Sequence, residues 1–342
     1  MRILVLGGGW FLGRAVVDTA LRSGLDVTVF NRGRSAAPPA AAAHVRGDRT
    51  DPADLARLAR SGRWDTVIDV HGVVPRQIGA AAAALQAVAE RYVLVSSVSA
   101  YRDWPRQPVQ EGSPLHPDAD PDADPGNWVW GSGAYGPLKA GAEAALARWY
   151  PPERSLVLRP GVVLGPGEYG GRLTWWLRRA AAAGPILAPG RPDDPLRPVD
   201  VRDLALFLLH LIGQGAAGVY NVAGPAGRDT WGGLLRDCLR VTGSAGEPVW
   251  VDGQWLADAD VRQWVELPMW RTAAGTWRID TSRAEAAGLT CRPLDHTVAD
   301  TWAWLSAGGT PVTTDRQAIH GMDPDREHEL LARWRQRPPT GR

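Results

Sequence analysis

The chain has 342 residues, of which 22% are charged, and its formal net charge at pH 7 is +1. This length is enough for one large domain or two joined domains, and the near-neutral charge argues against nucleic acid as a partner. Only Cys238 and Cys291 occur, without metal-ligand spacing, so we expect neither a disulfide framework nor a metal site. The sequence has no apolar run of about eighteen residues and no signal peptide, which predicts a cytoplasmic protein without a membrane partner.

The N-terminal residues have the pattern of a dinucleotide-binding unit. Residues 2–6 are an apolar run typical of a buried parallel strand, and a helical pattern follows from Arg14 to Leu21. A glycine-rich turn lies between them, and glycines there allow the backbone and the helix N-terminus to approach a pyrophosphate closely. The predicted cofactor-binding residues of this turn are Gly7, Gly8, Gly9, Trp10, Phe11, Leu12 and Gly13.

A second predicted strand, residues 26–30, ends at Asn31, which is followed by Arg32 and Arg34. An acidic residue at this place would bind the ribose 2′-hydroxyl of NAD, whereas arginines suit a 2′-phosphate. The sequence therefore favours NADP(H) as the cofactor, with NAD(H) as the alternative. A short third strand over 44–48 ends in Asp48, a candidate partner for the adenine amino group.

The strands predicted at 66–70 and 92–95 are followed by polar residues, as is typical of loops that line a cofactor cleft in a doubly wound sheet. After the first come His71 and Gly72, which we assign to cofactor binding, and after the second come Ser97 and Ser99, which we assign to the substrate. A long irregular stretch over 102–133 follows. Trp128 and Trp130 lie near its end, and we interpret the stretch as a partly mobile lid that brings aromatic walls to the substrate.

Tyr135 and Lys139 are the most informative pair in the chain. Lys139 is the only lysine among 38 basic residues. It lies four residues after Tyr135, a spacing that places both side chains on one helix face, and the predicted helix extends to about Trp149. An ammonium group is compact and sits close to oxygen atoms, which a guanidinium fork does less well. This pair is therefore predicted to be catalytic.

The remaining pattern predicts an α/β fold: a Rossmann-like, doubly wound parallel sheet with a smaller, mostly C-terminal domain. We assign residues 1–170 and 199–223 to the NADP-binding domain, 171–198 and 224–320 to a substrate-binding domain, and 321–342 to a C-terminal helix or tail. The chain has seventeen tryptophans, many of them in the C-terminal part. Two roles are open for them: lining an aromatic substrate pocket, or packing in the core and at a dimer interface.

Taken together, these motifs resemble the extended short-chain dehydrogenases/reductases, the NAD(P)-dependent epimerase/dehydratase group. The resemblance is carried by the 7–13 turn, Ser97, the Tyr135-x-x-x-Lys139 pair, the segment from Arg159 to Gly167, and the segment 199–203. The segments 31–34, 74–77 and 135–139 look like an atypical bacterial branch, distantly related to chloroplast stem-loop RNA-binding proteins. Two departures are Trp10, where the family usually has a glycine, and a long insertion between Tyr101 and Tyr135.

The resemblance implies a Ser97–Tyr135–Lys139 triad. A phenol with a pKa near ~10 is a poor base at neutral pH, and a neighbouring ammonium favours the phenolate. Tyr135 would then exchange a proton with a substrate oxygen, Lys139 would also hold the nicotinamide ribose, and Ser97 would polarise the carbonyl. The further residues assigned to the cofactor are Pro160 and Val162, and Arg197 is assigned to the substrate.

The leading hypothesis is an NADP(H)-dependent oxidoreductase acting on a small organic carbonyl or alcohol. A first alternative is a redox-neutral epimerase, dehydratase or isomerase that retains NAD(P). A second is a non-enzymatic NADP sensor or RNA-binding protein, although the arginines are dispersed among acidic residues. A homodimer through the helix that begins at Tyr135 is an expectation from the resemblance alone.

Overall fold

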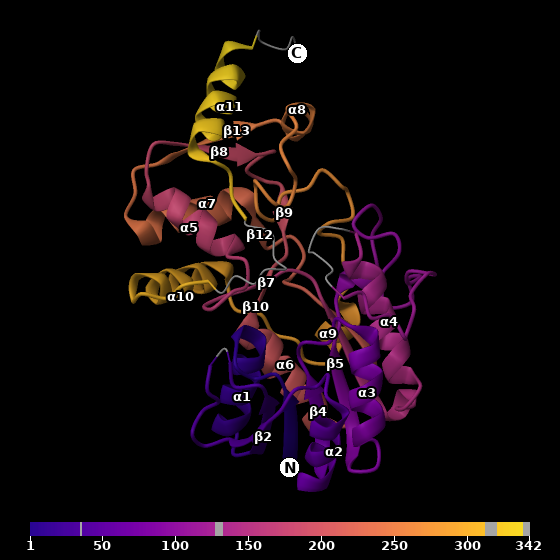
Figure 1. Ribbon diagram of the computed structural model, residues 1–342. Helices are drawn as coiled ribbons and strands as arrows, with labels where there is room; N and C mark the ends of the chain where they lie inside the picture. The colour runs from indigo at the N-terminus through magenta and orange to yellow at the C-terminus, as the bar shows by residue number, and fades with distance from the viewer. Residues whose placement is uncertain (35, 127–132, 312–319, 338–342) are drawn as a thin grey trace. The chain divides into compact units, whose positions relative to one another are not determined.

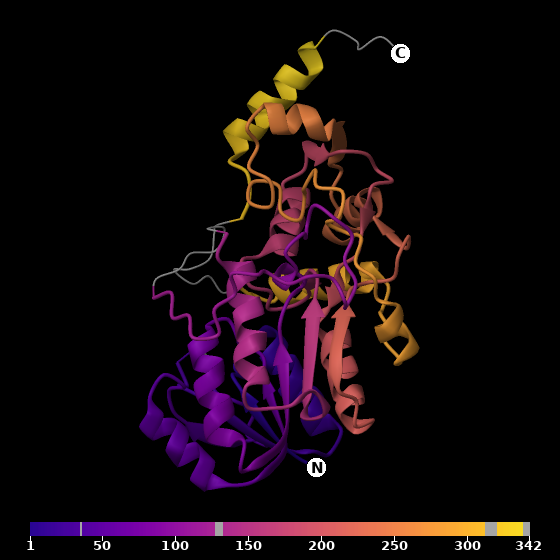
Figure 2. The ribbon, with the colours of Figure 1, turned by 90° about the vertical axis from the view of Figure 1, so that its right-hand side faces the viewer.

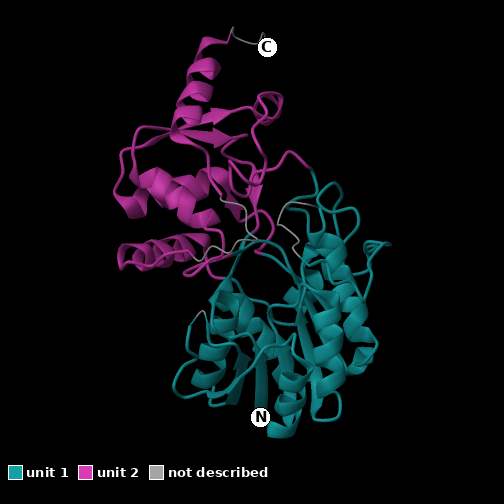
Figure 3. Ribbon diagram, in the orientation of Figure 1, with its two compact units in different colours: residues 1–163, 198–223, 274–291 teal, residues 164–197, 224–273, 292–342 magenta. Residues whose placement is uncertain are grey.

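The structure, a computed structural model, describes residues 1–34, 36–126, 133–311 and 320–337. They form two compact units (Figure 3). Unit 1 comprises residues 1–163, 198–223 and 274–291, and unit 2 comprises residues 164–197, 224–273 and 292–342. Among the described residues, no helix combines the length and the apolar character needed to cross a bilayer.

In the described part of the chain, a seven-stranded parallel sheet forms the centre of unit 1, in the order β11-β6-β5-β4-β1-β2-β3. Its central strands are buried on both faces, which explains their continuous apolar runs. The strand order reverses between β1 and β4, the place where ligands bind in such sheets. The strands are β1 (Arg2–Leu6), β2 (Asp26–Asn31), β3 (Ala43–Arg46), β4 (Trp64–Asp69), β5 (Ala89–Val95), β6 (Ser155–Pro160) and β11 (Gly218–Val222).

Helices cover the sheet on both faces (Figures 1 and 2). On one face α1 (Phe11–Arg22) packs against α6 (Val201–Gly213), and on the other α3 (Pro75–Leu85) packs against α2 (Pro52–Ser61) and α4 (Tyr135–Ala147). The predicted doubly wound α/β fold is therefore confirmed. Unit 1 also contains η1 (Val98–Ala100), η2 (Pro152–Arg154) and α9 (Ser282–Ala286).

The alanine-rich segment after β4 forms α3, which begins at Pro75 and ends at Leu85. Proline is favoured in the first turn of a helix, where its missing N–H costs nothing. After the helix, the carbonyl of Val88 accepts from the backbone N–H of Trp64 where the chain enters β5.

The stretch 102–126 is part of the folded unit. The N–H of Val109 donates to the carbonyl of Arg278, and the N–H of Asp280 donates back to Val109, which forms a bridge between Val109 and Ile279. Tyr101, Val109 and Ile279 share a small apolar core. This stretch therefore packs with residues 274–291. Trp128 and Trp130 lie outside the described residues.

Unit 2 is built around buried aromatic side chains. Trp176 is fully buried, and its ring lies 4.6 Å from that of Trp175 and 5.2 Å from that of Trp231, centroid to centroid. These three tryptophans pack the core of unit 2. The elements of this unit are α5 (Arg172–Ala181), α7 (Trp231–Thr242), α8 (Gly253–Asp258), α10 (Leu294–Ser306), α11 (Pro324–Gln336), the parallel pair β8 (Pro185–Pro189) and β13 (Glu247–Val251), and the antiparallel pair β9 (Pro195–Leu196) and β12 (Asp229–Thr230). Two short strands, β7 (Val163–Leu164) and β10 (Val199–Asp200), complete the structure.

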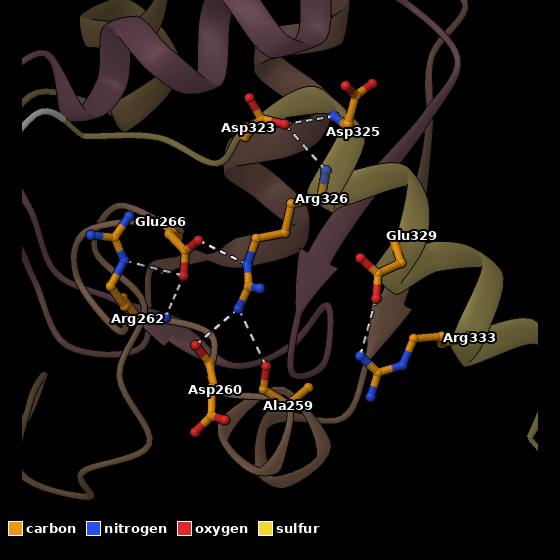
Figure 4. Close-up of polar contacts among 9 residues, drawn as sticks. All are labelled: Ala259, Asp260, Arg262, Glu266, Asp323, Asp325, Arg326, Glu329 and Arg333. Carbon is orange, nitrogen blue, oxygen red and sulfur yellow. Dashed lines mark hydrogen bonds and ion pairs between the residues drawn. The ribbon is translucent and has the colours of Figure 1, made fainter.

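The C-terminal helix α11 is fastened within unit 2 by polar contacts at its N-terminal end (Figure 4). Asp323 caps the helix by accepting from the N–H groups of Asp325 and Arg326. The Arg326 guanidinium pairs with the buried carboxylate of Glu266 at 2.9 Å and donates to the carbonyls of Ala259 and Asp260. Residues 324–336 are therefore a helix that packs within unit 2.

Candidate active site

The glycine turn between β1 and α1 is tightly folded. Gly7 and Gly8 have φ of 116° and 79°, a region that side-chain-bearing residues rarely adopt. A Cβ atom on Gly13 would lie 2.7 Å from the backbone nitrogen of Gly8, so α1 can pack this close to the turn only with glycine at that position. Gly7 and Gly13 both pack against the side chain of Val70, which follows β4.

The N-terminus of α1 suits an anionic ligand. Trp10 is the N-cap residue, and its indole cannot accept a hydrogen bond from the first turn of the helix. The first turn contains no acidic residue. Backbone N–H groups and the positive end of the helix dipole therefore point to the place where a pyrophosphate binds in dinucleotide folds. The residues of the glycine turn therefore fit the pyrophosphate of a dinucleotide. Gly9 and Phe11 belong to the same turn, and Leu12 is buried beneath it.

Asn31 organises the basic turn that follows β2. Its amide nitrogen donates to the carbonyl of Gly7 at 2.7 Å, and its oxygen accepts from the N–H of Gly33 at 2.8 Å. The side chain therefore joins the basic turn to the glycine turn. Arg32 and Arg34 are exposed, and His44 of β3 lies 3.0 Å from the Asn31 oxygen.

Arg46 and Asp48 flank this turn on the side of β3. The guanidinium of Arg46 donates to the carbonyl of Arg32, so His44 and Arg46 add basic side chains that the sequence pattern did not single out. The carboxylate of Asp48 accepts from the backbone and hydroxyl of Thr50 and lies 3.8 Å from Arg32. Partial burial raises the pKa of Asp48, but the Thr50 hydrogen bonds and the nearby arginine charges outweigh it, so the pKa is lowered overall.

Ser97 lies directly after β5 and is 8% exposed. It caps η1, with its hydroxyl oxygen accepting from the N–H of Ser99 at 3.1 Å. η1 packs against the beginning of α4, where a Cβ on Gly136 would lie 2.5 Å from the carbonyl oxygen of Ser99. A glycine after Tyr135 therefore lets the helix that carries the tyrosine approach the serine segment.

Tyr135 and Lys139 lie in the first turns of α4, as predicted. Tyr135 is half-buried, and the Lys139 ammonium lies 5.8 Å from the centroid of its ring. Lys139 is 4% exposed, and its Nζ donates to the carbonyl oxygens of Gly72 at 2.7 Å and Val95 at 2.8 Å. It thereby joins α4 to the ends of β4 and β5. Burial lowers the pKa of Lys139 to about 8, although the carboxylates of Asp69 and Glu143 oppose the shift.

Glu143 supports this corner one helical turn after Lys139. Its carboxylate forms a two-pronged ion pair with Arg159 on β6, with distances of 2.5 and 3.0 Å, and accepts from the hydroxyl of Ser96 at 2.5 Å. One carboxylate thus fixes α4 to the ends of β5 and β6. No motif in the sequence singles out Glu143, although its i+4 spacing from Lys139 is a usable signal.

The other predicted residues fall into three groups. His71 is exposed, Pro160 and Val162 are buried, and all three lie at or just beyond the carboxyl ends of unit 1 strands. Arg197 belongs to unit 2, where it is 7% exposed and its Nε donates to the carbonyl of Gly224 at 2.7 Å. Trp128 and Trp130 are outside the described residues. The roles assigned to all of these residues stay predictions.

In the described ranges, no group of three or more His, Cys, Asp or Glu side chains has the arrangement of a metal site. The fold and the glycine turn at the sheet's switch point define a dinucleotide-binding α/β protein. Residues 3–223 match the NAD dependent epimerase/dehydratase family, and the chain belongs to that family. The resemblance to the NAD(P)-dependent epimerase/dehydratase group that the sequence motifs predicted is therefore confirmed.

Among known proteins, the chain is similar to a plant protein. The chloroplast stem-loop binding protein of 41 kDa b of Arabidopsis thaliana is 25% identical over 263 residues, which cover 71% of this chain and 63% of that protein. The chain thus spans less than two thirds of that relative's length.

Two crystal structures share the fold. Bordetella bronchiseptica WbmG, in complex with NAD and UDP, has a TM-score of 0.67 and 19% identity, covering 92% of this chain and 98% of that chain. UDP-glucose 4-epimerase of Thermotoga maritima, with UDP-glucose, has a TM-score of 0.65 and 19% identity, covering 90% of this chain and 99% of that chain.

Proposed function

We propose that the protein transfers hydride between NADP(H) and a small organic carbonyl or alcohol, with Tyr135, Lys139 and Ser97 as its catalytic residues. The observation that carries the proposal is the placement of Lys139. The only lysine of the chain is buried beside Tyr135, and two backbone carbonyls at the switch-point edge of the sheet hold its ammonium. Burying an ammonium group is costly, so a solvated surface role would not account for it.

A bound nicotinamide would supply or accept the hydride. In the direction of reduction, Tyr135 would donate its phenolic proton to the carbonyl oxygen, which becomes the hydroxyl of the alcohol product. Ser97 donates a hydrogen bond to the same oxygen and polarises the carbonyl. The positive charge of Lys139 favours the phenolate that remains on Tyr135. Two of the three Nζ protons are bonded to carbonyls, and the third suits a ribose hydroxyl.

The preference for NADP(H) rests on the basic turn. Asn31 is neutral, so it does not repel a 2′-phosphate. Its side-chain amide is hydrogen-bonded to the backbone of Gly7 and Gly33, so it does not replace the acidic residue that binds a ribose 2′-hydroxyl. Arg32 and Arg34 are exposed beside it, with His44 and Arg46 nearby. Such a cluster of donors suits a phosphate with two negative charges.

The test is oxidation of NADPH, followed by its absorbance, over a panel of aldehydes, ketones and keto sugars. We expect at least one compound to be reduced, with NADPH preferred over NADH. No reaction across the panel, together with no binding of NADPH in calorimetry, would contradict the proposal.

A redox-neutral epimerisation or dehydration is the second candidate. It is favoured by the likeness to structures crystallised with NAD and with UDP or UDP-glucose. Such an enzyme re-reduces its own substrate and retains its cofactor. Acid release of tightly bound NAD from freshly purified protein, with isomerisation of a sugar nucleotide and no net NADPH oxidation, would favour this candidate over the first.

RNA binding is a third candidate, suggested by the printed name of the Arabidopsis relative. Many arginines of the described residues are paired with carboxylates, among them Arg14 with Asp18, Arg148 with Asp122 and Arg333 with Glu329. Paired arginines form a weak electrostatic footprint for phosphates. Retention of a stem-loop RNA at physiological salt would revive this candidate.

A further inference from the structure

A buried carboxylate lies beneath the candidate active site and is not part of the triad. Asp69, the last residue of β4, is 0% exposed. Its oxygens accept four hydrogen bonds: two from the guanidinium of Arg49 at 3.0 and 2.6 Å, one from the hydroxyl of Tyr92 at 2.8 Å, and one from the N–H of His71 at 3.2 Å. Burial raises the pKa of Asp69, but the charge and hydrogen bonds of Arg49 and the Tyr92 hydroxyl outweigh it and lower the pKa overall.

Arg49 reaches this carboxylate from the adenine side of the predicted cofactor site. It follows Asp48 in the connection between β3 and α2, and only 15% of its side chain is exposed. A guanidinium that binds a carboxylate with two parallel hydrogen bonds fixes orientation as well as distance. The ion pair therefore holds the loop that carries Asp48 against the end of β4.

The Asp69 carboxylate is also connected to Lys139, through the backbone of His71 and Gly72. Asp69 accepts from the N–H of His71, and the next residue, Gly72, offers its carbonyl to the Lys139 ammonium at 2.7 Å. The Gly72 peptide has little room to move, because a Cβ on it would lie 2.5 Å from a methyl of Leu94. A short turn, residues 69–72, thus connects the Arg49 ion pair to the catalytic lysine.

We propose that Arg49 and Asp69 are positioning residues that couple the adenine-side loop of the cofactor site to Lys139 through the turn 69–72. Binding of the adenosine half of a dinucleotide orders the loop at Asp48, and the ion pair transmits this to the Gly72 carbonyl that holds the lysine. The proposal rests on the proposed function only in assigning this site to a nicotinamide dinucleotide, and it can be measured without turnover.

Several charged groups face Lys139 and decide how its ionisation responds. The carboxylates of Asp69 on β4 and Glu143 on α4 raise its pKa, whereas Arg49 lowers it, in addition to the effect of burial. The ring of Tyr135 lies 5.8 Å away, and His71 belongs to the connecting turn. A change at the ion pair must therefore alter both the position of the ammonium and its titration.

The composition of the chain provides the probe. Because Lys139 is the only lysine, protein labelled with 13Cε-lysine gives a single lysine resonance, whose position and titration report this site alone. ADP, which lacks nicotinamide, is added to occupy the adenosine half. In the wild-type protein we expect ADP to shift this resonance and its pKa. In Arg49→Met we expect ADP to bind and the lysine response to be lost.

Two further variants and one control complete the experiment. Arg49→Lys keeps the charge and should restore part of the response. Tyr92→Phe removes one hydrogen bond to Asp69 and leaves the Arg49–Asp69 ion pair in place. It replaces Arg49→Met as the test variant if Arg49→Met does not fold. Arg60→Met changes an exposed arginine of α2 and should leave the response unchanged. If the ADP phosphates instead shift the Lys139 resonance directly through their charge, the shift would persist in Arg49→Met, and this outcome would overturn the proposal. So would ADP binding without any lysine response in the wild-type protein. If neither ADP nor NADPH binds, the proposed function fails as well.

Discussion

The lysine corner and the basic turn, the two ends of the candidate cofactor site, are built in opposite ways. In the lysine corner, made by Ser97, Tyr135, Lys139 and their supports Asp69 and Glu143, the charged groups are largely or fully buried. They are hydrogen-bonded to fixed backbone or to a partner of opposite charge. In the basic turn, residues 31–34, Asn31 is bonded to backbone whereas Arg32 and Arg34 are exposed.

This difference matters because charges interact more strongly in a buried site than in water. The lysine corner gains precision from burial, and each of its charges needs a partner because an unpaired buried charge is expensive. The basic turn is adaptable, and its charges act on a ligand through a screened field. Substitutions in the lysine corner should therefore affect catalysis and folding, and those in the basic turn should affect cofactor choice.

The largest effect on turnover is expected for Tyr135→Phe. Without the hydroxyl, no group is in place to pass the proton, so kcat/KM on a substrate found in the carbonyl panel should fall by at least ~10²-fold. The dissociation constant of NADPH, measured by tryptophan fluorescence, should change little. Tyr150→Phe, which alters a buried tyrosine of the core, is the control. Undiminished turnover in Tyr135→Phe would refute the assigned catalytic role.

Two arginine–aspartate pairs, Arg49–Asp69 in the buried region and Arg32–Asp48 at the exposed turn, allow the two regions to be compared by their effect on stability. Arg49→Met leaves the carboxylate of Asp69 buried without its cation, which should lower the free energy of unfolding by about 3–5 kcal/mol. Arg32→Met removes an exposed pair at 3.8 Å, and the loss should be below about 1 kcal/mol. Urea unfolding of the two variants measures both values. Equal losses would mean that burial does not distinguish the two regions.

The pH dependence of stability should report the burial of Lys139. Its pKa is about 8 in the folded protein and near the ordinary 10.5 when unfolded. Between these values the unfolded chain binds the additional proton, so the stability of the wild-type protein rises with pH through this window. Relative to Lys139→Met, the gain should total about 3 kcal/mol. Guanidinium unfolding of both proteins at several pH values gives the difference, and parallel curves would show that the lysine titrates normally.

A smaller effect is expected where α4 meets η1. Gly136→Ala places a methyl group 2.5 Å from the carbonyl oxygen of Ser99, and relieving this contact should cost about 1–3 kcal/mol and displace Tyr135 from Ser97. Gly112→Ala, where no atom lies within 4 Å of the new methyl, is the matched control. Stability and kcat are the measurements, and a Gly136→Ala enzyme as active and stable as the control would contradict the close packing.

The smallest effect is expected in the basic turn. Arg34→Ala should weaken NADPH binding by about tenfold, because one charged hydrogen bond to a phosphate is lost, and should leave NADH binding unchanged. Calorimetric titration with both cofactors measures the ratio. The exposed Arg14→Ala on α1 is the control. An equal loss for NADH and NADPH would place Arg34 outside 2′-phosphate recognition.

Local pattern alone determined much of this protein. The apolar runs, the turn from Gly7 to Gly13 and the Tyr135–Lys139 spacing specified a doubly wound sheet and the order of its motifs, because each signal lies within a few consecutive residues. The positions of Ser97 and Lys139 at strand and helix ends followed from the same reasoning, since strands of a parallel sheet present their carboxyl ends on one edge.

Tertiary structure decided which residues support the site. Arg49 and Asp69 are twenty residues apart, and Glu143 and Arg159 are sixteen apart, so no local pattern pairs them. The joining of residues 102–126 to residues 274–291 likewise depends on contacts between distant segments, such as Val109 with Ile279. The burial that lowers the pKa of Lys139 exists only once β4, β5 and α4 have been brought together, because a charge loses its water only inside a packed fold.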